Sequence, residues 1–235
     1  MKSVLVTGGT VRLGRVISEY LRNCDYRVLT TSSRGGSAAD IVADFREPLG
    51  AAMCYSSALR LLGGVPPDAV VNNAALFLGT GPEVEAVNLI APKKLTMMMA
   101  GRETSGRGCV INILDAVEPP PFSSTNGLSA GDRPLSAGDR PRRNVDYCRT
   151  KRELREYTRV AAAMFSDTLR VNSVSPGPID ELGPVMVHEK ADVCPLGRPK
   201  AFDVAKAVVF LIENESVTGI DIPVDGGLTG CGGVG

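Results

Sequence analysis

The amino-terminal sequence reads Lys2-Ser-Val-Leu-Val-Thr7 and continues directly as Gly8-Gly-Thr-Val-Arg-Leu-Gly14. The first stretch is rich in β-branched residues and predicts a strand. After the second, apolar residues recur at helical spacing as far as Asn23, which predicts a helix. A strand that passes through a glycine turn into a helix can bind a pyrophosphate on main-chain N–H groups. The stretch therefore predicts a dinucleotide-binding unit, although ordinary strand-to-helix turns also look like this.

Strands and helices are expected to alternate along the rest of the chain. The expected strands are 26–32, 41–44, 69–72, 108–114, 169–174 and 219–224, and the expected helices are 48–62, 83–99 with a kink at Pro92, 146–165 and 202–212. This order predicts an α/β fold, with a doubly wound, mostly parallel sheet of seven strands and helices on both faces. Ligands then bind at the carboxyl ends of the strands.

The composition of the 235 residues favours one α/β domain, with 43% apolar and 22% charged residues. Lys plus Arg equals Asp plus Glu at 26 each, which argues against a nucleic-acid or membrane-surface partner. The six cysteines form no Cys-x-x-Cys pair and His188 is the one histidine, so neither a metal site nor a disulfide framework is expected. No signal-peptide or membrane-spanning pattern is present, and we expect a soluble, cytoplasmic protein.

Residues 147–151 read Tyr-Cys-Arg-Thr-Lys. On a helix, Tyr147 and Lys151 are one turn apart and face the same way. The ammonium group then favours the ionised phenol, which makes the tyrosine a usable general acid near neutral pH. Alone, such a pair is more often two exposed residues on one helix face. Combined with the glycine turn, it indicates a nucleotide-dependent redox enzyme.

The choice of cofactor depends on the end of the second expected strand. NADH-selective sites carry an acidic residue there for the ribose 2′-hydroxyl, whereas arginine accommodates a 2′-phosphate. No acidic residue occurs from Tyr26 to Ala39, while Ser33 and Arg34 lie where the strand ends and Arg12 can approach from the first turn. Arg34 as a solvated loop charge would not explain the missing acid. We therefore expect NADPH.

These motifs, taken together, resemble the short-chain dehydrogenase/reductase family along nearly the whole chain. The matches, in order, are the turn at 7–14, Asp44, Asn72-Asn73-Ala74, Asn88 to Pro92, Tyr147 to Lys151, Arg170 to Asn172, Pro176-Gly177, Pro195 to Arg198, Val217 to Gly219 and Asp225-Gly226-Gly227. The resemblance implies a Rossmann-type fold and hydride transfer from a nicotinamide. It also implies that Tyr147 is the acid or base, that Lys151 binds the ribose hydroxyls and that Asn88 supports a water relay.

The resemblance extends to the cofactor site and to assembly. It implies a homo-oligomer, with the tetramer as the common form in the family. The expected cofactor-binding residues, including the two arginines named above, are Gly8, Arg12, Leu13, Gly14, Ser33, Arg34, Asp44, Asn73, Ala74, Lys151, Pro176 and Gly177.

The chain departs from the common family pattern at the fifth expected strand. The family usually ends this strand in a catalytic serine, whereas this chain reads Ile111-Asn-Ile-Leu-Asp115-Ala116. Pteridine reductases make the same replacement, share the Arg12-Leu13-Gly14 turn, and place an aromatic residue shortly after Asn-Asn-Ala, where Phe77 stands here. The chain is therefore similar to the pteridine or dihydropteridine reductases of the family, in which that ring stacks on the pterin.

The aspartate agrees chemically with a pterin-like substrate. A carboxylate would oppose the oxyanion that develops during carbonyl reduction. Reduction of a C=N bond instead needs an acid and an acceptor for ring N–H groups, and Asp115 could serve as either. The expected substrate-binding residues are Arg12, Phe77, Asp115 and Tyr147.

Three alternatives remain open from the sequence. Asp115 could be a turn-forming residue after a strand. The enzyme could be a carbonyl or β-ketoacyl reductase, although that chemistry favours serine at position 115. A non-catalytic NADP(H)-binding sensor is disfavoured, because cofactor binding alone does not require Tyr147.

An insertion separates Asp115 from Tyr147, which lie 32 positions apart where the family uses little more than a dozen. Residues 128–134, Leu-Ser-Ala-Gly-Asp-Arg-Pro, recur unchanged at 135–141. The Gly, Ser and Pro content predicts a low-complexity loop at about 118–144 within a single domain of residues 1–235. A tolerated surface duplication is the simpler interpretation, and a lid beside the active site is the other.

Overall fold

The computed structural model describes residues 1–34, 38–104, 106–116, 145–179 and 194–230, so the insertion expected at 118–144 lies outside the described residues. The strands are β1 (Ser3–Val6), β2 (Arg27–Ser32), β3 (Ile41–Val42), β4 (Ala69–Asn72), β5 (Gly108–Ile113), β6 (Leu169–Pro176) and β7 (Asp221–Val224). The helices are α1 (Arg12–Asn23), α2 (Gly50–Leu61), α3 (Gly81–Glu85), the π-helical turn η1 (Ala86–Ile90), α4 (Ala91–Ala100), α5 (Val145–Met164) and α6 (Ala201–Glu213).

The strands form one seven-stranded sheet in the order β3-β2-β1-β4-β5-β6-β7, and every neighbouring pair is parallel. The chain runs outward from β1 to β3, then returns to β4 and runs outward to β7. The direction of winding therefore reverses between β1 and β4, which opens a crevice at the carboxyl ends of these strands. The predicted Rossmann-type, doubly wound fold is confirmed, with a sheet that is parallel throughout.

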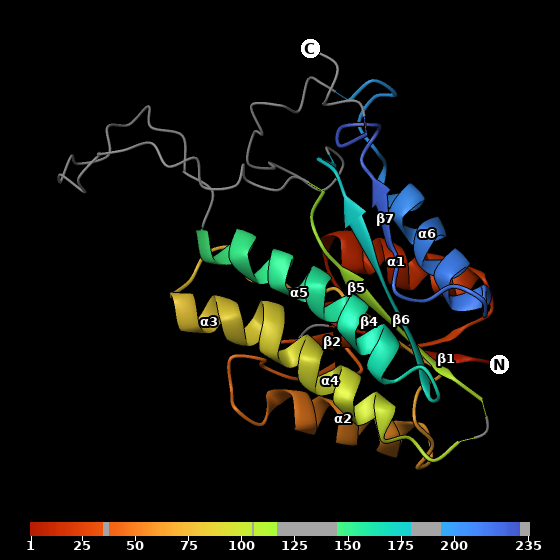
Figure 1. The fold of residues 1–235 in the computed structure, drawn as a ribbon. Coiled ribbons are helices and arrows are strands. Elements are labelled where there is room, and N and C mark those ends of the chain that lie inside the picture. Colours follow the sequence, from red (N-terminus) through yellow and green to blue (C-terminus); the bar gives the residue numbers. More distant parts are fainter. Residues whose placement is uncertain (35–37, 105, 117–144, 180–193, 231–235) are drawn as a thin grey trace.

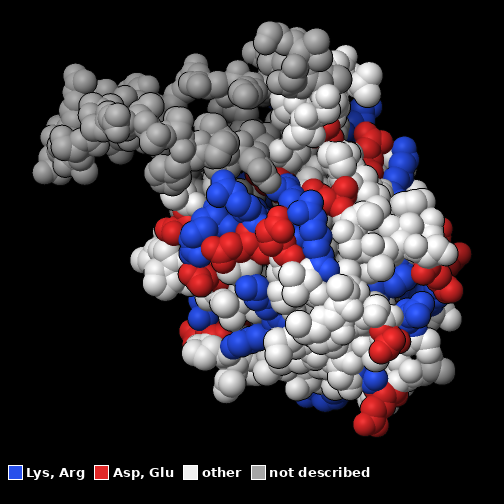
Figure 2. All heavy atoms as spheres, viewed as in Figure 1, with Lys and Arg blue, Asp and Glu red and all other residues white. Residues whose placement is uncertain are grey.

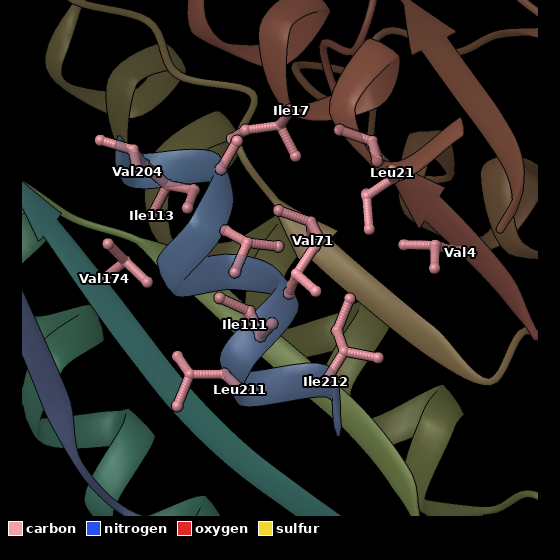
Figure 3. Packing of buried hydrophobic residues seen from close by; sticks show 14 of the residues in the cluster. Val4, Ile17, Leu21, Val71, Ile111, Ile113, Val174, Val204, Leu211 and Ile212 are labelled. Atoms are coloured by element: carbon pink, nitrogen blue, oxygen red, sulfur yellow. The ribbon is translucent and has the colours of Figure 1, made fainter. Parts of the chain in front are cut away.

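Helices cover both faces of the sheet (Figure 1). Helices α1 and α6 pack on one face, and α2, α4 and α5 pack on the other. Figure 3 shows the first of these cores, where Leu211 and Ile212 of α6 lie over Val71 and Ile111 of the central strands. Because both faces are buried, the central strands need apolar side chains in both directions, which explains their continuous apolar runs.

The expected helix at 83–99 is interrupted in its interior. The π-helical turn η1 lies in front of Pro92 and ends immediately before α4. Pro92 has no N–H to donate, and its ring would collide with the carbonyl four residues earlier in a regular helix. A wider turn in front of the proline leaves room for the ring, and it also carries Asn88. The other element boundaries lie within two residues of the expected ones.

Acidic and basic side chains lie side by side on the face shown in Figure 2, over α3 and α5. Arg149 of α5 contacts Glu85 of α3 at 2.8 Å and Glu153 at 2.9 Å, so these charges neutralise one another locally. Among the described residues, no helix combines the length and the apolar character needed to cross a membrane. The described part of the chain also holds no group of His, Cys, Asp and Glu side chains suited to a metal ion.

Candidate active site

A cavity of about 720 Å³ lies at the carboxyl ends of the strands. It brings together almost all the residues that the sequence predicts for the site. Those lining it are Gly8, Arg12, Leu13, Gly14, Ser33, Arg34, Asp44, Asn73, Ala74, Phe77, Asp115, Tyr147, Lys151, Pro176 and Gly177. Asn88 is the predicted residue that does not line it.

The glycine turn is held against the end of β4. Thr7 Oγ1 accepts hydrogen bonds from the main-chain N–H groups of Asn73 and Ala74, both at 3.0 Å. The Asn73 amide donates to the carbonyl oxygen of Thr7 at 3.0 Å. Gly14 packs so closely that a Cβ there would collide with the carbonyl oxygen of Gly8 and the Asn73 amide. The turn can therefore present its N–H groups only if position 14 has no side chain.

Arg12 adopts a left-handed backbone conformation, with φ of +49°. A residue with a side chain pays about 1–2 kcal/mol for this conformation. Arg12 lines the cavity together with Ser33 and Arg34. The first acidic residue after β2, Asp40, accepts hydrogen bonds from the N–H and hydroxyl of Thr30, so its carboxylate is engaged by the strand.

Arg46 lines the cavity and was not predicted from the sequence. Its Nε donates to both carboxylate oxygens of Asp44, at 3.0 and 3.1 Å, and hydrogen bonds from Arg46 lower the pKa of that carboxyl. Asp44 lies two residues beyond β3. The Asp-x-Arg spacing was the available signal for Arg46.

Tyr147, Asp115 and Phe77 meet in the cavity. The Tyr147 hydroxyl donates to Asp115 Oδ2 at 3.4 Å. The rings of Phe77 and Tyr147 lie 4.8 Å apart between centroids, tilted by 45°. Although 32 positions separate Asp115 from Tyr147, the end of β5 and the first turn of α5 bring a proton donor, a carboxylate and an aromatic face to one place.

Lys151 lies one turn beyond Tyr147 on α5 and is 6% exposed. Its Nζ donates to the carbonyl oxygen of Ile113 at 2.8 Å and lies 5.6 Å from the centre of the Tyr147 ring. Burial lowers the pKa of Lys151 to about 8, against the opposing effect of the Asp115 carboxylate. The ammonium group is therefore still charged at neutral pH, close to the phenol.

The lowered pKa of Lys151 predicts a pH-dependent stability of the cofactor-free protein. Below about pH 8 the lysine is protonated in both the folded and the unfolded chain, and its burial costs stability. From about pH 8 to 10.5 the folded chain loses this proton while the unfolded chain keeps it. The free energy of unfolding of the wild type should therefore rise with pH in this window, relative to Lys151→Met. Urea titrations of both proteins across the window measure this difference, and a constant difference would contradict the shift.

Asn88 is 1% exposed and lies on η1, behind the cavity wall. Its side-chain oxygen, Oδ1, accepts a hydrogen bond from the main-chain N–H of Leu76 at 2.7 Å. Its side-chain amide nitrogen, Nδ2, donates to the main-chain carbonyl oxygen of Leu76 at 2.9 Å. Leu76 lines the cavity next to Phe77. The Asn88 side chain therefore fixes the loop that carries the aromatic ring.

The chain is similar to known oxidoreductases. A family model described as enoyl-(acyl carrier protein) reductase matches residues 136–229. A putative ketoacyl reductase of granaticin polyketide synthase from Streptomyces violaceoruber is 28% identical, covering 95% of this chain and 94% of the relative. A 2,5-dichloro-2,5-cyclohexadiene-1,4-diol dehydrogenase from Sphingobium indicum is 25% identical, covering 96% and 95%.

Among solved structures, the chain is similar to FolM alternative dihydrofolate reductase 1 from Brucella canis, complexed with NADP. The TM-score is 0.76 and the identity 25%, covering 99% of this chain and 96% of that one. The similarity therefore spans the whole cavity, from the glycine turn to Gly177.

Proposed function

We propose that this chain is an NADPH-dependent oxidoreductase of the short-chain dehydrogenase/reductase family, and that it transfers hydride to a C=N bond of a pterin. The proposed substrates are dihydropterins and dihydrofolate. The hydride comes from the nicotinamide and adds to the carbon of the C=N bond, a proton adds to the nitrogen, and NADP⁺ leaves.

The Asp115 carboxylate carries this proposal. It lies 3.4 Å from the Tyr147 hydroxyl, where a carbonyl reductase would need a neutral donor for a developing oxyanion. A carboxylate suits the nitrogen-rich edge of a pterin, because it accepts hydrogen bonds from ring N–H and amino groups. The Phe77 ring beside Tyr147 offers a face on which a flat heterocycle can stack. The similarity to a dihydrofolate reductase complexed with NADP supports the same substrate class.

In this proposal each side chain has a distinct task. Tyr147 donates the proton to nitrogen, and Lys151 binds the nicotinamide ribose and keeps a positive charge near the phenol. Asp115 orients the pterin edge. The main-chain carbonyl of Asn88, rather than its amide, would carry any water relay, because the amide is bound to Leu76.

The remaining cavity residues are proposed to hold the cofactor. The turn from Gly8 to Gly14 takes the pyrophosphate, and Arg12, Ser33 and Arg34 take the 2′-phosphate. The other proposed contacts are Leu13, Asp44, Asn73, Ala74, Pro176 and Gly177, all of which line the cavity.

A carbonyl or β-ketoacyl reductase is the second candidate. The ketoacyl reductase relative at 28% identity favours it. The two candidates require different groups at position 115, since a ketone needs a neutral donor there and a pterin does not.

The experiment that decides between them is a turnover assay with NADPH. The purified protein is supplied in parallel with dihydrobiopterin, dihydrofolate and a panel of ketones and β-ketoacyl thioesters. We expect the pterin compounds to give the highest kcat/KM. Turnover of ketones alone would establish the second candidate, and tight NADPH binding without any turnover would establish a sensor.

The cofactor assignment gives a separate prediction. NADPH should bind about tenfold or more tightly than NADH, equivalent to about 1.4 kcal/mol, because two guanidinium groups meet the 2′-phosphate. Arg12→Ala combined with Arg34→Ala should remove most of this preference in a fluorescence titration. The matched control is Arg15→Ala, because Arg15 is exposed on α1 and pairs with Glu19. A double variant that keeps the preference would show that the 2′-phosphate lies elsewhere.

We also propose a homo-oligomer, with the family's common tetramer as the expected form. Static light scattering measures the mass of the particle in solution. A particle mass near the 24.7 kDa of one chain would contradict the proposal.

A further inference from the structure

Three side chains on one stripe of α5 contact the end of β5. Tyr147, Lys151 and Arg155 are four residues apart, so successive members lie one turn further along the same helix face. The Tyr147 hydroxyl meets the carboxylate of Asp115, and Lys151 Nζ donates to the carbonyl oxygen of Ile113. Arg155 Nη2 donates to the carbonyl oxygen of Asp115 at 2.9 Å. Asp115 is therefore contacted through its side chain by one member of the stripe and through its main chain by another.

Arg155 is itself held by an acidic residue of the edge strand β7. Its side chain is 13% exposed, and its Nε donates to Asp221 Oδ2 of β7 at 3.0 Å. Its Nη2 also donates to Ser175 Oγ of β6 at 3.1 Å. The Ser175 hydroxyl and the Ser173 hydroxyl both donate to Asp221, at 2.8 Å. One planar guanidinium thus joins α5, β6, β7 and the end of β5.

The main chain around Asp115 leaves little room for adjustment. The N–H groups of its two neighbours, Leu114 and Ala116, donate to the carbonyl oxygens of Val174 and Pro176 of β6 at 2.8 and 2.9 Å. The Asp115 carbonyl oxygen, which lies in the chain between these two N–H groups, is the one that Arg155 binds. Arg155 and β6 therefore both hold the main chain from which the Asp115 side chain projects toward the Tyr147 hydroxyl.

We propose that Arg155, anchored by Asp221, is a positioning residue that fixes the Asp115 carboxylate against the Tyr147 hydroxyl. Arg155 acts through the main chain of Asp115, and the proposal needs no contact between Arg155 and substrate or cofactor. It rests on the proposed function to the extent that Asp115 binds the substrate. In this proposal Arg155, Asp221 and Ser175 have a role in the site, which the sequence motifs do not predict.

Arg155→Lys separates positioning from simple structural support. Lysine keeps a positive charge beside Asp221, so the carboxylate retains a partner and the fold is preserved. An ammonium group on a flexible stem lacks the planar fork that reaches Asp221, Ser175 and the Asp115 carbonyl at once. The matched control is Arg159→Met, because Arg159 is exposed one turn further along α5 and pairs with Glu156.

The first test measures kcat for dihydrobiopterin, the Kd of NADPH and the melting temperature of each variant. For Arg155→Lys we expect kcat to fall by about tenfold or more, the scale of a misplaced catalytic group, with the Kd of NADPH within about twofold of wild type. In an Asp115→Ser background the same change should lower the residual kcat by less than about twofold, because Arg155 then has no carboxylate to position. Arg159→Met should match the wild type in all three measurements.

The second test does not depend on turnover. Crystal structures of the wild type and of Arg155→Lys, both with NADPH, should show the Asp115 carboxylate displaced from the Tyr147 hydroxyl only in the variant. An undisplaced carboxylate overturns the proposal, as does a wild-type kcat in Arg155→Lys or an equal loss in both backgrounds. If the wild-type enzyme reduces no pterin, the proposed function fails, and the crystal structures alone decide the role of Arg155.

Discussion

Replacing Tyr147 with phenylalanine is expected to lower kcat by about 10²- to 10⁴-fold, the range that a positioned general acid contributes. The hydroxyl that meets Asp115 at 3.4 Å is lost, while the ring that packs 4.8 Å from Phe77 is kept. The loss should therefore appear in proton transfer and not in the shape of the cavity. Steady-state turnover of dihydrobiopterin and of a ketone, each with saturating NADPH, measures it.

The matched control for this variant is Tyr157→Phe. Tyr157 lies on the same helix, half-buried, with its hydroxyl 3.5 Å from the carbonyl oxygen of Lys93, away from the cavity. Its replacement should leave kcat close to the wild-type value. The Kd of NADPH for Tyr147→Phe should stay within about threefold of wild type, since one phenol hydroxyl contributes at most a modest hydrogen bond. A Tyr147→Phe enzyme with near-normal turnover would remove this tyrosine from the mechanism.

Replacing Asp115 with serine is expected to change the substrate class of the enzyme. Pterin turnover should fall by about 10²-fold, because an acceptor for the pterin edge becomes a small neutral hydroxyl. Turnover of simple ketones should rise, because the same hydroxyl can donate to a developing oxyanion. The ratio of the two activities within one variant is insensitive to the fraction of enzyme that is folded.

Asp115→Asn refines this result. Asparagine keeps the shape and one acceptor oxygen but replaces the other acceptor with an NH2 donor, so its pterin turnover should lie between those of wild type and Asp115→Ser. The Kd of NADPH should be unchanged in both variants. Near-normal pterin reduction by Asp115→Ser would show that Asp115 only forms the turn after β5.

The fold could be predicted because its elements have local signatures. Both faces of the sheet are covered, so buried strands such as β4 and β5 appear as short apolar runs between helices of regular periodicity. The π-helical turn η1 has no such signature. Its wider hydrogen bonding is fixed by Pro92 on one side and by the contact between Asn88 and Leu76 on the other, and the second of these depends on tertiary structure.

The same distinction applies to the site. The glycine turn and the pair Tyr147 and Lys151 could be found because their chemistry depends on spacing within one element. Arg155 was missed because its partner Asp221 lies 66 positions away on β7, and only the sheet order brings them together. Arg46 was missed because the resemblance assigns a role to Asp44 and none to the residue that binds it.

The central claim, hydride transfer from NADPH to a C=N bond of a pterin, can be measured directly by isotope transfer. NADPH carrying deuterium at the transferable position of the nicotinamide is incubated with the wild-type enzyme and dihydrobiopterin, and the product is examined by mass spectrometry and proton NMR. We expect deuterium on the ring carbon of the reduced bond, and no transfer with Tyr147→Phe over the same time. Unlabelled pterin, alongside deuterium in the alcohol formed from a ketone under the same conditions, would contradict the account.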